Sequence, residues 1–248
     1  MSSFQLLLLV HIIADFYLQW RSLAKGKEAL FNKAPEGVSK SEGILSLGLY
    51  TFLYALLFVL LVALDETTKG SYIYAFFIIV GAHLVIEILT CYLKKIIKQT
   101  SAFLLYHGLH AVLFQAVISA FDLKFNVTLW WVYRLWPVYI ALLLIKPTSV
   151  FIDLVFKDLY GDGDDRLFRS SSLIGVFERI IIFCLLYLKM FPAIWIIIAA
   201  KTLVCYEKLK TDAQSRGKYL VGTLISVAVP ILLYTLLTIW YPVFSFNI

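Results

Sequence analysis

The sequence predicts an all-α integral membrane protein, a polytopic bundle of about eight transmembrane helices. Hydrophobic residues make up 61% of the 248 residues, charged residues only 15%, and the mean hydropathy is +0.86. An ordinary soluble chain is about half apolar. About 20 consecutive apolar residues cross the hydrocarbon region as a helix, because backbone polar groups must be paired within the segment in lipid.

The chain divides into apolar runs separated by charged connections, and we expect residues 1–248 to form a single transmembrane domain. The expected spans are 4–20, 44–64, 71–93, 101–121, 127–145, 173–188, 191–205 and 219–241. Residues 21–43 and 146–172 are the longest connections. The first of these is either a solvated loop or a short amphipathic helix that lies on an anionic leaflet through Lys25, Lys27 and Lys33.

The basic residues predict the orientation of these spans. The first, third, fifth and seventh connections hold 16 Lys and Arg residues, whereas the second, fourth and sixth hold 3. The positive-inside rule therefore places the longer connections in the cytoplasm and both termini outside, in a multi-pass protein of the inner or plasma membrane. The net charge of +6 reflects this topology, so we expect lipid, including anionic headgroups, as the partner and not nucleic acid. Homo- or hetero-oligomers stay open.

Imidazole and carboxylate groups recur at i, i+3 and i, i+4 on three of the expected helices. Such spacing puts them on one helix face, and facing helices can then converge on one metal. The six candidate ligands are His11, Asp15, His83, Glu87, His107 and His110. Counted from the cytoplasmic helix ends at 1.5 Å per residue, all lie roughly 9 to 17 Å deep. The pattern predicts an intramembrane centre for one or two divalent metals: zinc, manganese or iron.

Three further charges are expected at the same depth, and we predict catalytic roles for them. Arg179 and Lys201 would neutralise an anionic headgroup or a developing oxyanion. Glu178 would orient Arg179 or shuttle a proton. Charges in a membrane helix are costly, so they normally face the bundle interior and pair or bind a ligand.

Several readings of this polar layer remain. The leading hypothesis is a metal-dependent intramembrane hydrolase that cleaves a lipid ester or phosphoester. A transporter or channel for protons or metal ions is the alternative, and a membrane-anchored signalling or defence component with a structural metal is the third. Haem bound by two histidines, and plain interhelical hydrogen bonding, also fit the residue types.

The motifs on these helices resemble those of a bacterial membrane-protein family known as domain of unknown function 3307. The first helix carries its His-x-x-x-Asp-Phe-x-x-Gln pattern, and three later helices carry Ile-Gly-x-x-Glu-Arg, Ala-Ala-Lys and Gly-Thr-Leu. The matching residues are His11, Asp15, Phe16, Gln19, Ile174, Gly175, Glu178, Arg179, Ala199, Ala200, Lys201, Gly222, Thr223 and Leu224. The resemblance implies a shared polar centre but no particular reaction.

The chain departs from that family pattern near the expected site. Glu87 stands where the third helix usually has Asp. Tyr106 and His107 replace an Asp-Gln pair on the fourth helix, whereas His110 keeps the histidine. Ser172 replaces an expected Arg. Of the candidate ligands, His107 therefore has the weakest support from the resemblance.

Overall fold

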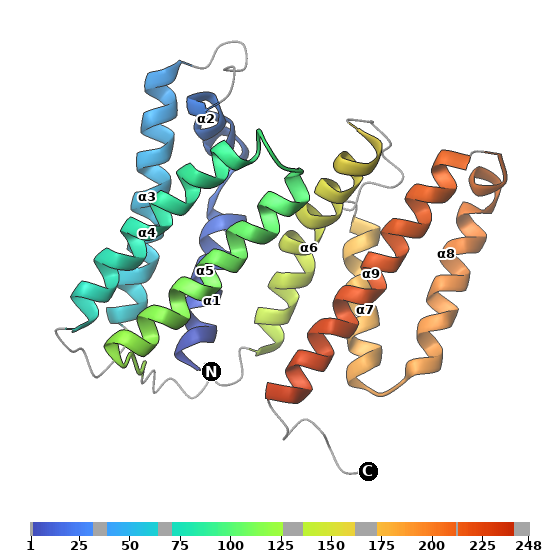
Figure 1. The fold of residues 1–248 in the computed structure, drawn as a ribbon. Coiled ribbons are helices and arrows are strands. Elements are labelled where there is room, and N and C mark those ends of the chain that lie inside the picture. Colours follow the sequence, from blue (N-terminus) through green and yellow to red (C-terminus); the bar gives the residue numbers. More distant parts are fainter. Residues whose placement is uncertain are drawn as a thin grey trace. The chain divides into compact units, whose positions relative to one another are not determined.

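The computed structural model (Figure 1) describes residues 2–31, 39–63, 71–125, 136–161, 173–211 and 213–240, and all regular elements in these ranges are helices. Five of them are long and apolar enough to cross a membrane. They are α3 (Lys40–Ala63), α4 (Ser71–Leu93), α5 (Gln99–Phe121), α6 (Trp136–Tyr160) and α9 (Ala213–Trp240). The all-helical, membrane-type fold is thus confirmed, whereas the count of eight spans and the orientation of the termini stay predictions.

The chain forms two compact units, Met1–Tyr139 and Ile140–Ile248. Large apolar side chains are exposed along the outer faces of their helices, for example Phe52, Ile73 and Phe77 in the first unit and Trp195 and Val204 in the second. A lipid bilayer is the environment in which such faces are stable.

The first helix changes its hydrogen-bonding pattern halfway along. Ser2 begins α1 (Ser3–Ile12) with a capping box in which the Ser2 Oγ accepts from the Gln5 backbone, and the Gln5 side chain accepts from the Ser2 backbone. Residues Ile13–Leu18 then continue as the π-helix η1. π-Helical turns are rare and frequently mark functional sites, and this one contains Asp15.

Helix α2 (Arg21–Phe31) packs directly on α3 through two glycines. A Cβ atom on Gly26 would lie 2.1 Å from the Ser46 Oγ, and one on Gly43 would lie 2.6 Å from the Leu30 Cγ. Residues 21–31 therefore form a helix that packs against α3, and not a solvated loop. Lys27 is only 4% exposed, so it does not reach toward a lipid surface as expected; Lys33 lies outside the described residues.

Helices α1, α3, α4 and α5 enclose the core of the first unit, and α4 and α5 lie side by side (Figure 1). The buried core residues are Leu6, Leu7, Ala14, Tyr54, Phe58, Leu61, Tyr72, Ala75, Ile79, Phe114, Val117, Leu123 and Phe125. After α5 the chain is fastened to the bundle, because the Phe125 N–H donates to the Ser3 Oγ (3.2 Å) and the Tyr72 hydroxyl donates to the Lys124 carbonyl (2.9 Å).

Helix α6 continues to Tyr160, well past residue 145, where the sequence pattern predicted that the span ends; residues 127–135 lie outside the described ranges. Pro147 has no N–H and leaves the Leu143 carbonyl without its helical donor. The Thr148 hydroxyl donates to that carbonyl at 2.7 Å. Ser and Thr side chains often re-satisfy backbone groups in this way, so a proline need not end a membrane helix. The predicted connection 146–172 is thus helical up to residue 160.

The second unit also contains α7 (Leu173–Tyr187) and α8 (Phe191–Thr211), with α9 packed against both. Ile182, Leu186 and Ile194 form its buried apolar cluster. The glycines of α9 allow close approach by α6, since a Cβ on Gly222 would lie 2.9 Å from the Phe156 ring. Both α8 and α9 extend beyond the predicted spans on the side of their connection.

Candidate metal centre

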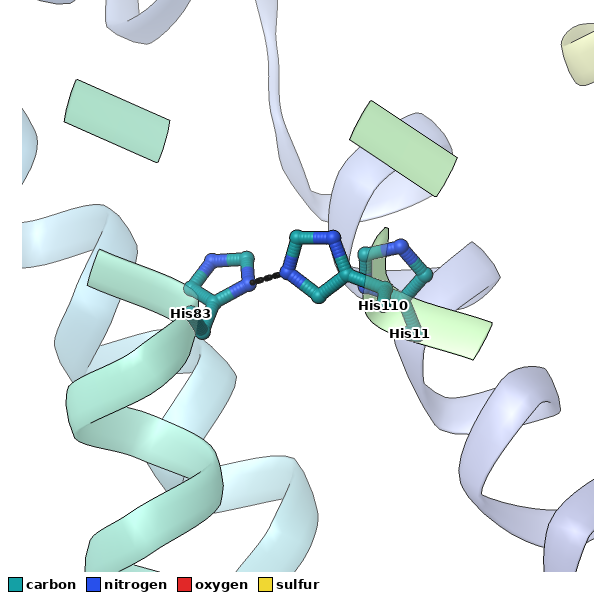
Figure 2. A group of neighbouring side chains, drawn as sticks. All are labelled: His11, His83 and His110. Carbon is teal, nitrogen blue, oxygen red and sulfur yellow. Dashed lines mark hydrogen bonds between the residues drawn. The ribbon is translucent and has the colours of Figure 1, made fainter. Parts of the chain in front are cut away.

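Three fully buried histidines meet inside the first unit. His11 on α1, His83 on α4 and His110 on α5 are each 0% exposed. Each offers one ring nitrogen, and these three atoms lie within 4.8 Å of one another. Figure 2 shows the His83 and His110 rings facing each other, with His11 beside His110. The helical spacing in the sequence pointed to this grouping, and metal binding itself stays a prediction.

The protonation of His110 follows from its neighbours. Its Nδ1 lies 2.8 Å from the Tyr106 carbonyl oxygen, which can only accept, so Nδ1 carries the proton. The Nε2 atom therefore has a free lone pair, and it lies 2.9 Å from the His83 Nδ1. His83 Nδ1–H donates to it, which leaves a lone pair on the His83 Nε2. That atom is buried and has no hydrogen-bond partner.

His11 also presents one engaged and one open nitrogen. Its Nε2 lies 3.3 Å from the His107 Nδ1 and 3.5 Å from an Asp15 carboxylate oxygen. Its Nδ1 is buried without a partner. Burying a polar atom unpaired costs free energy, and such atoms in native proteins usually face a water or an ion. The open Nδ1 of His11, which lies in the three-histidine group, is thus a chemical sign of a ligand.

His11, Asp15 and His107 form a second group of potential ligands within 4.8 Å, which shares His11 with the first. Asp15 accepts a short hydrogen bond from the Tyr50 hydroxyl. The Tyr50 hydroxyl uses its one proton in this bond, so it accepts in its hydrogen bond with the Tyr106 hydroxyl. A chain of groups with exchangeable protons therefore runs from Tyr106 through Tyr50, Asp15 and His11 to His107.

Glu87, the sixth predicted ligand, belongs to neither group. Its carboxylate pairs with the Lys27 ammonium at 2.6 Å, and the same ammonium lies 3.6 Å from the centre of the Tyr50 ring. With its amide oriented to satisfy both neighbours, Gln19 donates to the Asp15 carbonyl at 3.1 Å and accepts from Lys27 at 2.7 Å. Lys27 was not among the site residues predicted from the sequence, although Gly26 beside it was a sign of close packing.

Aromatic rings surround the histidines, and the sequence analysis did not predict them either. Tyr54 stacks on His83 with 3.7 Å between ring centroids, and Phe16 stacks on His107 at 5.3 Å. Phe114 meets His11 edge to face. Such rings fix imidazole orientation and exclude water. Their signal in the sequence was weak, because aromatic residues are common throughout this chain.

The three predicted catalytic residues lie in the second unit. The Lys201 ammonium donates to Glu178 at 2.5 Å. Arg179 is 0% exposed; its Nε donates to the Leu144 carbonyl (2.9 Å) and its Nη2 to the Ser149 hydroxyl (2.6 Å), while Nη1 is buried without a partner. Arg179 thus fastens α7 to the proline-containing part of α6. The catalytic roles of the three residues stay predictions.

Residues 3–138 match the family model described as "Protein of unknown function (DUF3307)". The matched stretch holds all six candidate metal ligands, and it ends before Glu178, Arg179 and Lys201. The motifs of the three later helices therefore lie beyond it. No curated protein and no solved structure matched the chain.

Proposed function

The chain belongs to DUF3307, a family of unknown function, and from the geometry of its buried histidines we propose that it is a membrane metalloprotein. Its centre binds a divalent metal through His11, His83 and His110. The reaction class that best fits such a centre inside a bilayer is hydrolysis of a lipid ester or phosphoester.

The observation that carries this proposal is the convergence of three buried imidazoles on one point. Three histidine ligands with an open fourth position are the arrangement of catalytic zinc. Two nitrogens on a tetrahedral zinc lie about 3.3 Å apart, and His83 Nδ1 and His110 Nε2 are 2.9 Å apart. A metal would replace this hydrogen bond after a small displacement of the rings, with His83 Nδ1 as the ligand atom and the His83 proton on Nε2.

The surroundings of the ligands also suit a metal. Metal-bound histidines usually donate their second N–H to a carbonyl or carboxylate, which fixes the ring. The Tyr106 carbonyl does this for His110. Asp15 lies 3.5 Å from the His11 Nε2 and can do it for His11 while Nδ1 ligates. Asp15 and His107 are also the residues available for a second ion.

A zinc ion held by these three histidines would supply a nucleophile, because catalytic zinc lowers the pKa of its bound water to about 7. In the proposed topology of eight spans with both termini outside, the centre lies on the cytoplasmic side of the cell membrane. Lipid is then the accessible substrate.

Metal content of the detergent-purified protein tests the proposal. We expect near-stoichiometric zinc, manganese or iron in the wild type and its loss in His83→Ala. His107→Ala is the matched control, because His107 lies outside the three-histidine group and the variant should keep the metal. If His107→Ala loses the metal and His83→Ala retains it, the ion binds in the second group, formed by His11, Asp15 and His107. A folded wild type that binds no added metal would contradict the proposal.

Hydrolysis needs its own measurement. Vesicles of phospholipid that contain the metal-loaded wild type should release a hydrolysis product detectable by mass spectrometry, and vesicles with His83→Ala should not. If the metal is present but the lipids stay intact, the centre is not a lipid hydrolase.

Proton transfer across the membrane is the second candidate function, and one observation favours it. Tyr106, Tyr50, Asp15, His11 and His107 follow one another through hydrogen bonds or close contacts. Proteoliposomes with an entrapped pH dye would report such transfer. Acidification that Tyr50→Phe abolishes would support it, and no acidification in the wild type would count against it.

A further inference from the structure

The side chain of Lys27 extends from α2 to residues on α3 and α4 that lie next to the candidate ligands. Its ammonium contacts Glu87 on α4 and the face of Tyr50 on α3. Gly26 permits this position, because α2 comes close to α3 only where there is no side chain. Lys27 is only 4% exposed and contacts Glu87, Tyr50 and Gln19, so it is part of the site.

Two carboxylates, Asp15 and Glu87, have the same position in sequence relative to a histidine ligand. Asp15 follows His11 by four residues, and Glu87 follows His83 by four, so each lies one turn along its helix from a histidine ligand. Asp15 joins His11 and His107 as a potential ligand, whereas Glu87 does not. The difference between them is their partner: Asp15 accepts from the neutral Tyr50 hydroxyl, and Glu87 is paired with a cation.

We infer that Lys27 is a positioning residue of the metal centre that holds the Glu87 carboxylate away from the metal and thereby keeps the coordination number low. This inference rests on the proposed metal centre. A buried carboxylate must be paired, because an uncompensated charge in an apolar surrounding is costly. Without Lys27, Glu87 would need another cation, and His83 would hold the proposed metal one helical turn along α4.

The consequence is chemical. Three histidines and one open position suit a bound water, whereas a carboxylate added to these ligands raises the coordination number. Lys27 would therefore keep the centre in its reactive form. The cation lying over Tyr50 also holds the ring whose hydroxyl donates to Asp15, so both carboxylates are positioned from one side chain.

Cobalt substitution tests this directly, since the visible absorption of Co²⁺ is intense in four-coordinate sites and weak in five- or six-coordinate ones. We expect the intense spectrum in the wild type and in Lys27→Arg, which keeps the charge. Lys27→Met should show the weak spectrum. The double variant Lys27→Met/Glu87→Gln should regain the intense spectrum, because the released carboxylate is gone. A monodisperse elution profile shows in each case that the variant is folded.

The outcomes separate the inference from the proposal on which it rests. If wild type binds no Co²⁺, the metal centre itself is wrong. If wild type binds Co²⁺ and Lys27→Met gives the same spectrum, the centre stands and the inference is overturned. A weak spectrum in Lys27→Met that the double variant does not reverse would also overturn it, since Lys27 would then act on packing and not through Glu87. Should Lys27→Met fail to fold, Lys27→Gln with the matching Lys27→Gln/Glu87→Gln pair gives the same comparison.

Discussion

The Nδ1 atom of His83 lies 2.9 Å from the Nε2 atom of His110, so two buried imidazoles on α4 and α5 meet edge to edge. The backbone carbonyl of Tyr106 fixes the proton of His110 on its far nitrogen. The shared hydrogen bond is therefore the part of the pair that the proposed metal would replace.

Metal should stabilise the protein through this pair. A ligand that binds only the folded state adds about 2.7 kcal/mol at a free concentration of roughly 100 times Kd. We expect added zinc to raise the Tm of the chelator-treated wild type in detergent and to leave that of His110→Ala unchanged. His107→Ala is the control and should respond like the wild type. An equal shift in His110→Ala would mean that the stabilising ion binds elsewhere.

Tyr50→Phe should weaken metal binding without removing a ligand. The change deletes the hydroxyl that donates to Asp15, and loss of such a supporting partner typically lowers metal affinity roughly 10- to 100-fold. Isothermal titration with zinc measures the effect. Tyr72→Phe is the matched control, because its hydroxyl donates to the Lys124 carbonyl away from the histidines; it should keep wild-type affinity. Equal losses in both variants would indicate a general effect of losing a buried hydroxyl.

Gly26→Ala should displace α2 from α3. The new Cβ would lie 2.1 Å from the Ser46 Oγ and 2.7 Å from its Cβ, and overpacking of this kind costs about 1–3 kcal/mol. Thermal unfolding should show the loss, together with faster proteolysis within residues 21–31. Gly48→Ala on α3 is the control, since its Cβ meets nothing within 4 Å. That variant should be neutral or slightly stabilised, as alanine favours helix more than glycine does. A wild-type protease pattern in Gly26→Ala would argue against the close packing of α2 on α3.

Helical periodicity explains how much of this site could be predicted. Spacings of three and four residues put His11, His83 and His110 on inward faces, and three facing helices brought them together. The pairing of Glu87 with Lys27 could not be predicted in this way, because it depends on how α2 docks. The π-helix around Asp15 leaves no pattern in a uniformly apolar stretch. The end of α6 was misplaced because Lys146 and Pro147 together imitate the end of a span, whereas Thr148 repairs the helix there.

Thr148→Val should therefore destabilise the second unit. The Leu143 carbonyl, which Pro147 deprives of its N–H donor, accepts from the Thr148 hydroxyl at 2.7 Å, and Thr148 is 5% exposed. Leaving such a group unpaired costs about 1–3 kcal/mol. Thr235→Val is the matched control, because its exposed hydroxyl donates to the Ile231 carbonyl in an uninterrupted part of α9. Thermal unfolding in detergent should show a clear loss only for Thr148→Val. If both variants melt like the wild type, the hydroxyl does not repair α6, and a proline in this helix is tolerated for another reason.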